Sequence, residues 1–186
     1  EWTKAREIEL VNRYISENKN MLDPDAVREM AFSDIGYNGK NVQEYREAEK
    51  HLRDVIFEQM MDKAERDGNK TIVFLTGVGG AGKSNATKNL DFSKKGVIFD
   101  SAFNSFNSLD AQLAKAHARG FEIDVVAIHN DPITAFTNTL NRGKAKGRFL
   151  ALNYFIKAFS SNANKIRLLS GKYPRSEERR VGKECL

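Results

Sequence analysis

The sequence predicts an α/β fold, a parallel sheet flanked by helices with a helical N-terminal extension. Two observations lead to this prediction. Apolar residues recur at helical spacing through residues 1–69, and at Thr71 the pattern changes to continuous runs of β-branched and aromatic residues. Such runs are typical of strands that are buried on both faces of a parallel sheet. Helical segments separate the runs, and strand–helix–strand alternation is characteristic of parallel α/β folds.

The N-terminal segment, residues 1–69, is predicted to be helical. Residues 3–19 and 41–67 carry apolar side chains at mainly three- and four-residue steps, which indicates two amphipathic helices. Asp23 followed by Pro24 predicts the start of a short helix between them. Aspartate caps helix N-termini, and proline suits the first helical position.

The second part of the chain is predicted to alternate between strands and helices. The strands are expected over residues 71–76, 96–100 and 122–128. The helices are expected over residues 83–90, 108–119, 131–141 and 149–170. Since sheets of this type use about five strands, three strands predict a truncated domain that is marginally stable.

The last twelve residues, 175–186, are not expected to belong to the α/β domain. Residues 175–185 resemble the in-frame translation of a sequencing-library adapter, and we expect residues 175–186 to be an artefactual tail. This leaves residues 1–69 as the helical extension and residues 70–174 as the truncated α/β domain. The tail contains Cys185, the only cysteine, so the remainder offers no disulfide framework or thiolate metal site. That composition fits a cytoplasmic protein.

The charge is unevenly distributed along the chain. The whole sequence has a formal net charge of +5; residues 1–70 carry −4, and residues 71–174 carry +8. A basic half suits either nucleic acid or a site that holds phosphates. No apolar run approaches the ~18–20 residues that span a bilayer, so a membrane partner is not expected.

A glycine-rich segment carries the strongest chemical signal. Residues 77–84, Gly-Val-Gly-Gly-Ala-Gly-Lys-Ser, match the phosphate-loop pattern and stand between a predicted strand and a predicted helix. In this pattern backbone N–H groups surround the phosphates, the lysine reaches the β- and γ-phosphates, and the serine hydroxyl binds Mg²⁺. The residues expected to bind the nucleotide are Gly77, Gly79, Gly80, Ala81, Gly82, Lys83, Ser84 and Asn85.

Asp100 is a second candidate, because it ends a predicted strand at the edge where open α/β sheets bind ligands. Its carboxylate suits either Mg²⁺ binding or removal of a proton from an acceptor hydroxyl. The structural alternative is a helix cap or turn residue. Ser101 follows it where a water-activating ATPase would have glutamate, which favours transfer to another acceptor.

Arg142 and Arg148 flank a segment that contains Gly143 and Gly147. On an unbroken helix, residues six apart would not share a face. Glycines that break the helix would let both guanidinium groups converge on a transferring phosphate. The alternative is a solvated basic loop.

Together these residues resemble the zeta-toxin family of P-loop kinases over roughly residues 71–170. The resemblance rests on residues 77–84, on Val97-Ile98-Phe99-Asp100-Ser101, and on Asn130-Asp131-Pro132 followed by Arg142 and Arg148. It implies a P-loop NTPase-type sheet, ATP·Mg²⁺ bound by Lys83 and Ser84, Asp100 as catalytic base, and arginines that clamp the transferring phosphate. It also implies a sugar-nucleotide type of acceptor and an antitoxin, or a larger phage or plasmid polypeptide, as partner.

Two other functions remain open from the sequence. One is a non-catalytic nucleotide-binding module within a larger phage or plasmid protein. The other is an NTPase that acts on nucleic acid, suggested by the basic half. The missing glutamate after Asp100 and the lack of a nucleic-acid-binding motif count against the latter.

Overall fold

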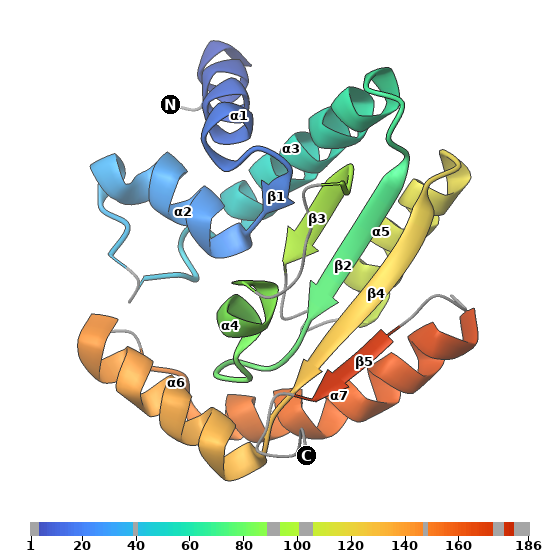
Figure 1. The fold of residues 1–186 in the computed structure, drawn as a ribbon. Coiled ribbons are helices and arrows are strands. Elements are labelled where there is room, and N and C mark those ends of the chain that lie inside the picture. Colours follow the sequence, from blue (N-terminus) through green and yellow to red (C-terminus); the bar gives the residue numbers. More distant parts are fainter. Residues whose placement is uncertain are drawn as a thin grey trace.

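A computed structural model describes residues 4–38, 41–88, 94–100, 106–146, 149–172 and 177–180 of the chain. Within these ranges five strands form one sheet in the order β1-β3-β2-β4-β5. The strands are β1 (Met21–Leu22), β2 (Thr71–Thr76), β3 (Val97–Asp100), β4 (Glu122–His129) and β5 (Glu177–Arg180). Every strand pair is parallel, as Figure 1 shows, so the predicted parallel α/β fold is confirmed.

Helices surround this sheet in the positions that the sequence predicts. They are α1 (Lys4–Asn18), α2 (Pro24–Phe32), the 3₁₀ helix η1 (Ser33–Ile35), α3 (Arg46–Arg66), α4 (Lys83–Lys88), α5 (Phe106–Ala118), α6 (Pro132–Lys146) and α7 (Leu152–Lys172). Two boundaries differ clearly from the prediction, because α3 begins five residues late, at Arg46, and α6 continues to Lys146. Among the helices of the described ranges, none has the length and apolar character needed to cross a membrane.

The sheet is buried on both faces, as its apolar strands predict. Alternate strand residues point to opposite faces. One face packs against α1, α2, α3 and α5, and the Phe57 ring of α3 lies 5.2 Å from that of Phe99 and 6.2 Å from that of Phe74. The other face packs against α6 and α7 through Ala135 and Phe155. The strand residues on this second face include Val73, Leu75, Ile98, Val126 and Ile128.

The N-terminal segment contributes a strand to the sheet. In β1, Leu22 lies in register with Phe99 of β3, and the Asn20 carbonyl accepts a hydrogen bond from the Ile98 N–H at 2.7 Å. The fully buried Tyr14 of α1 supports this strand, because its hydroxyl accepts a hydrogen bond from the Asp23 N–H at 2.8 Å. Continuing the register by one residue places Asp23 beside Asp100.

The sheet therefore contains two strands, β1 and β5, that the sequence did not predict. β1 has only two residues, too few for a hydrophobic pattern to be recognised. β5 lies within the segment expected to be an adapter-derived tail, and it pairs with β4 from Val126 to His129.

Candidate functional site

The glycine-rich segment forms the loop that joins the central strand to a helix. β2 ends at Thr76 and α4 begins at Lys83, and Figure 1 shows α4 at the carboxyl end of β2 and β3. The Lys83 ammonium folds back over the loop and donates a hydrogen bond to the Gly77 carbonyl at 3.0 Å. The strand–loop–helix context that the phosphate-loop pattern requires is therefore present.

Glycine is needed in this loop because other backbone lies very close to it. Gly80 has a φ of +76°, and a Cβ placed there would lie 2.0 Å from the Ala135 carbonyl oxygen of α6. The Asn138 amide of α6 donates a hydrogen bond to the Gly80 carbonyl at 3.1 Å. Helix α6 is therefore packed directly against the loop and fixes its path.

The remaining predicted loop residues follow the same tight course. The buried Ala81 donates its N–H to the Val78 carbonyl at 3.1 Å, and the Asn85 N–H bonds to the Gly82 carbonyl at 3.0 Å. Gly82 has a φ of +92°, which only glycine adopts readily. Gly79 lies in the same loop, and Ser84 lies in the first turn of α4.

Asp100 ends β3, next to β2, with Leu75 of β2 in register beside it. Burial raises the pKa of Asp100 to about 6. Lys83 and Arg142 act in the opposite direction, whereas the negative charges of Asp23 and Asp25 raise the pKa further. Lys83 and Arg142, which the sequence proposed separately, therefore both lie within electrostatic range of Asp100.

Two carboxylates at this site were not predicted from the sequence. Asp23 and Asp25, here called the acidic corner, stand where β1 ends and α2 begins. The Asp23 side chain accepts a hydrogen bond from the Asp25 N–H at 2.8 Å and so caps α2, as the sequence predicts. Burial also raises the pKa of Asp23. The sequence held one signal for this part of the site, because Asp23 directly follows the apolar pair Met21-Leu22 that forms β1.

Arg142 lies on α6 and reaches across to α2. Its Nη2 donates to Asp25 Oδ2 at 3.2 Å, and its side chain is 56% exposed. The predicted helix break at Gly143 is wrong, because α6 continues through Gly143 to Lys146. A Cβ on Gly143 would lie 2.6 Å from the Phe149 ring, so this glycine makes room for that ring. Arg148 and Ser101 lie outside the described residues.

The oxygen donors at this site bear on whether it could hold a metal ion. The described ranges contain no cluster of three or more His, Cys, Asp or Glu residues with the arrangement of a metal site. Mg²⁺ usually binds through one or two protein oxygens together with substrate phosphates and water. Ser84 at the start of α4 and Asp100 at the end of the neighbouring strand supply oxygen donors of this kind, so the residues fit Mg²⁺ that arrives with a nucleotide.

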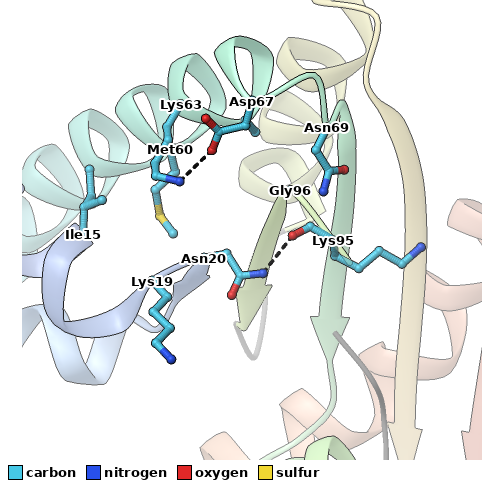
Figure 2. A pocket seen from close by; sticks show the side chains of 10 residues that line it. Ile15, Lys19, Asn20, Met60, Lys63, Asp67, Asn69, Lys95 and Gly96 are labelled. Atoms are coloured by element: carbon cyan, nitrogen blue, oxygen red, sulfur yellow. Dashed lines mark hydrogen bonds and ion pairs between the residues drawn. The ribbon is translucent and has the colours of Figure 1, made fainter. Parts of the chain in front are cut away.

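A hollow of about 500 Å³ lies at the opposite end of the sheet, where β3 begins (Figure 2). Several polar groups at its wall already have partners within the protein. The Asn20 amide donates to the Lys95 carbonyl at 2.8 Å, and Lys63 pairs with Asp67 at 2.7 Å. We therefore assign no function to this hollow.

The chain matches a known protein family. A family model described as Zeta toxin matches residues 87–181, half of the chain. The matched range includes Asp100 and Arg142, whereas the phosphate loop lies just before it. A search of curated proteins found no match.

Proposed function

The chain belongs to the zeta-toxin family, and on that premise we propose that it is an ATP-dependent phosphotransferase. The observation that carries this proposal is the position of Lys83, which lies over the glycine loop and within electrostatic range of Asp100. The proposed reaction transfers the γ-phosphate of ATP to a hydroxyl group of an acceptor such as a sugar nucleotide.

Lys83 and the loop backbone have the proposed task of binding the phosphates. The bond from Lys83 to the Gly77 carbonyl holds the ammonium over the loop before nucleotide arrives. Exchanging this neutral carbonyl for a phosphate oxygen gives a hydrogen bond in which both partners are charged, and such a bond is stronger. The loop residues Gly77, Gly79, Gly80, Ala81, Gly82, Ser84 and Asn85 complete the proposed phosphate site.

Asp100 has the proposed task of accepting the proton of the attacking hydroxyl. The acceptor oxygen forms a bond to the γ-phosphorus while the bond from that phosphorus to the bridging oxygen of ATP breaks. With a pKa of about 6, Asp100 is mostly ionised at neutral pH and is more basic than an ordinary aspartate. A raised pKa of this size suits a general base.

Arg142 and Arg148 have the proposed task of binding the charge on the transferring phosphate. The planar guanidinium group matches phosphate oxygens well. Mg²⁺, when bound, would neutralise phosphate charge, and Ser84 is the proposed ligand. Asp100 could instead act as a second ligand of Mg²⁺. The Asp100→Asn variant distinguishes the two roles. It keeps the Mg²⁺-dependent affinity for ATP if Asp100 is the base, and it weakens that affinity if Asp100 binds the metal.

The test of the nucleotide site is calorimetric titration of the full chain with ATP in the presence and absence of Mg²⁺. We expect wild-type protein to bind ATP and Lys83→Ala to lose at least ~100-fold in affinity, the scale of a lost buried charge–phosphate contact. Lys50→Ala removes an exposed lysine of α3 and should bind as wild type does. Equal binding by Lys83→Ala and wild type would overturn the proposed site.

Transfer is then tested with labelled ATP and a panel of sugar nucleotides. Labelled product that depends on Arg142 supports the phosphotransferase, because removal of a charge-stabilising group typically costs ~10²–10³ in rate. ATP binding without transfer to any acceptor, and with equal affinity for ATP and ADP, would instead support the non-catalytic nucleotide-binding module.

A further inference from the structure

Helix α6 carries two polar side chains that face the site. Asn138 donates to the Gly80 carbonyl of the phosphate loop at 3.1 Å, and Arg142 donates to Asp25 of α2 at 3.2 Å. Residues four apart lie on the same face of a helix. One face of α6 therefore bridges the phosphate loop to the acidic corner.

Within the described part of the chain, Asp25 is the hydrogen-bond partner of the Arg142 side chain. The Arg142 side chain is 56% exposed, and a long, exposed arginine loses considerable rotamer freedom when it is held in one position. Its guanidinium has five N–H donors. Nη2 bonds to Asp25, and no other described residue is hydrogen-bonded to the guanidinium, so its remaining donors can serve phosphate oxygens.

Asp25, in contrast, is held firmly. Its N–H bonds to the Asp23 side chain at 2.8 Å, within the first turn of α2. Its Oδ1 accepts from Arg28, whose side chain is only 11% exposed and also donates to the buried Glu49 at 3.2 Å. The two oxygens of Asp25 thus serve two arginines, one buried and one at the site.

We propose that Asp25 is a positioning residue that holds the Arg142 guanidinium beside the phosphate site. This inference rests on the proposed function, in which Arg142 contacts the transferring phosphate. Asp25 and Arg142 both lie within electrostatic range of Asp100, so the pair stands at the site rather than on a remote surface. The N-terminal segment therefore takes part in phosphate recognition through Arg142.

Asp25 could instead compete with the phosphate for Arg142, and the two roles predict opposite changes in phosphate binding. If the Asp25 carboxylate competed with the phosphate for Arg142, its removal would strengthen binding of a γ-phosphate. If Asp25 positions Arg142, its removal weakens that binding. The sign of the change distinguishes the two.

The experiment compares the affinity for the β,γ-imido analogue of ATP with the affinity for ADP, both with Mg²⁺. Their ratio isolates the contribution of the γ-phosphate and is insensitive to a general loss of stability. The proteins are wild type, Asp25→Asn, Arg142→Ala and the double variant. Asp34→Asn, which removes an exposed carboxylate of η1, is the matched control, and Asp25→Glu tests rescue.

We expect Asp25→Asn to lower the analogue-to-ADP ratio about two- to fivefold, the scale of a partly exposed ion pair. The same change in the Arg142→Ala background should have no further effect, because residues that act together are not additive. Asp34→Asn should leave the ratio unchanged, and Asp25→Glu should restore part of it.

The outcomes separate the two proposals. A wild-type ratio near one, or a ratio that Arg142→Ala leaves intact, overturns the role of Arg142 in the proposed function and the role of Asp25 with it. A ratio that Arg142→Ala lowers but Asp25→Asn leaves intact or raises overturns the positioning role alone. The positioning role is also overturned if Asp25→Asn lowers the ratio equally in wild type and in Arg142→Ala.

Discussion

The phosphate loop and the acidic corner both follow the carboxyl ends of parallel strands, yet they are built in different ways. The loop after β2 is defined by backbone, since a side chain at Gly80 would collide with the Ala135 carbonyl. The acidic corner after β1 is defined by side chains, and the Asp23 carboxylate caps α2 while Asp25 pairs with Arg28 and Arg142.

This difference explains why one region can be recognised in a sequence and the other cannot. A backbone cradle needs glycine at fixed spacing, and that requirement leaves a readable pattern. A carboxylate at a strand end needs only the correct register with its neighbour. The register of Leu22 with Phe99 brings Asp23 to Asp100 across more than seventy residues of sequence.

The largest effect is expected at Asp100, which ends β3, the strand between β1 and β2. Asp100→Asn should lower γ-phosphate transfer by about 10²–10⁴-fold, the usual contribution of a general base. The measurement is single-turnover transfer from labelled ATP to the acceptor found in the sugar-nucleotide panel. Asp34→Asn, which removes an exposed carboxylate of η1, is the control, and a loss of less than tenfold in Asp100→Asn would remove the base role.

The backbone character of the loop is tested by a pair of glycines with the same φ of +76°. Gly80→Ala should lower the free energy of unfolding by about 2–5 kcal/mol, because left-handed strain and a collision with backbone add together. Gly120→Ala has no atom within 4 Å of the new Cβ and should cost only about 1–2 kcal/mol. Denaturant unfolding measures both, and equal losses would contradict the close packing of α6 on the loop.

The cost of holding Asp100 ionised should appear as pH-dependent stability. Its pKa in the folded chain, about 6, is above the ordinary 3.8, so the folded chain binds more protons between these values and loses stability as the pH rises through them. Since each pKa unit is worth about 1.4 kcal/mol, Asp100→Asn should be more stable than wild type by up to ~3 kcal/mol at pH 8. Thermal unfolding from pH 4 to 8 measures the gain, which should vanish towards pH 4; a gain that does not change with pH would contradict it.

The smallest expected effect is a change in the pKa of Asp100 when the charge of Asp23 in the acidic corner is removed. Asp23→Asn keeps a helix-capping residue but removes a negative charge that raises the pKa of Asp100. The pKa of Asp100 should therefore fall below about 6, as measured by NMR titration of its carboxyl carbon in nucleotide-free protein. Asp34→Asn is the control, and an unchanged pKa in Asp23→Asn would show that the two carboxylates do not interact.

The fold was predictable where its signals are local. The three predicted strands, β2, β3 and β4, are mainly apolar, and the Asp23-Pro24 cap gave the start of α2 correctly. The two-residue β1 was not predictable, since its stability comes from pairing with β3 and from the buried Tyr14 rather than from its own sequence.

The candidate site divides in the same way. The sequence indicated Lys83 because it closes the glycine-rich motif before α4, and Asp100 because it ends a predicted strand. It misjudged Gly143, where a glycine suggested a helix break but instead makes room for the Phe149 ring. The partner of Arg142, Asp25, depends on the approach of α6 to α2, which no local pattern records.

The central claim is that the phosphate loop and the acidic corner belong to one nucleotide site. Hydrogen exchange with and without Mg²⁺ and ATP tests it most directly, because peptides covering residues 72–88 and 21–30 report the two regions separately. Our account predicts slower exchange in both peptides, lost in Lys83→Ala, and no change in residues 60–69 beside the hollow at the other end of the sheet. Slower exchange in the loop without any change in residues 21–30, or no change in the loop at all, would contradict it.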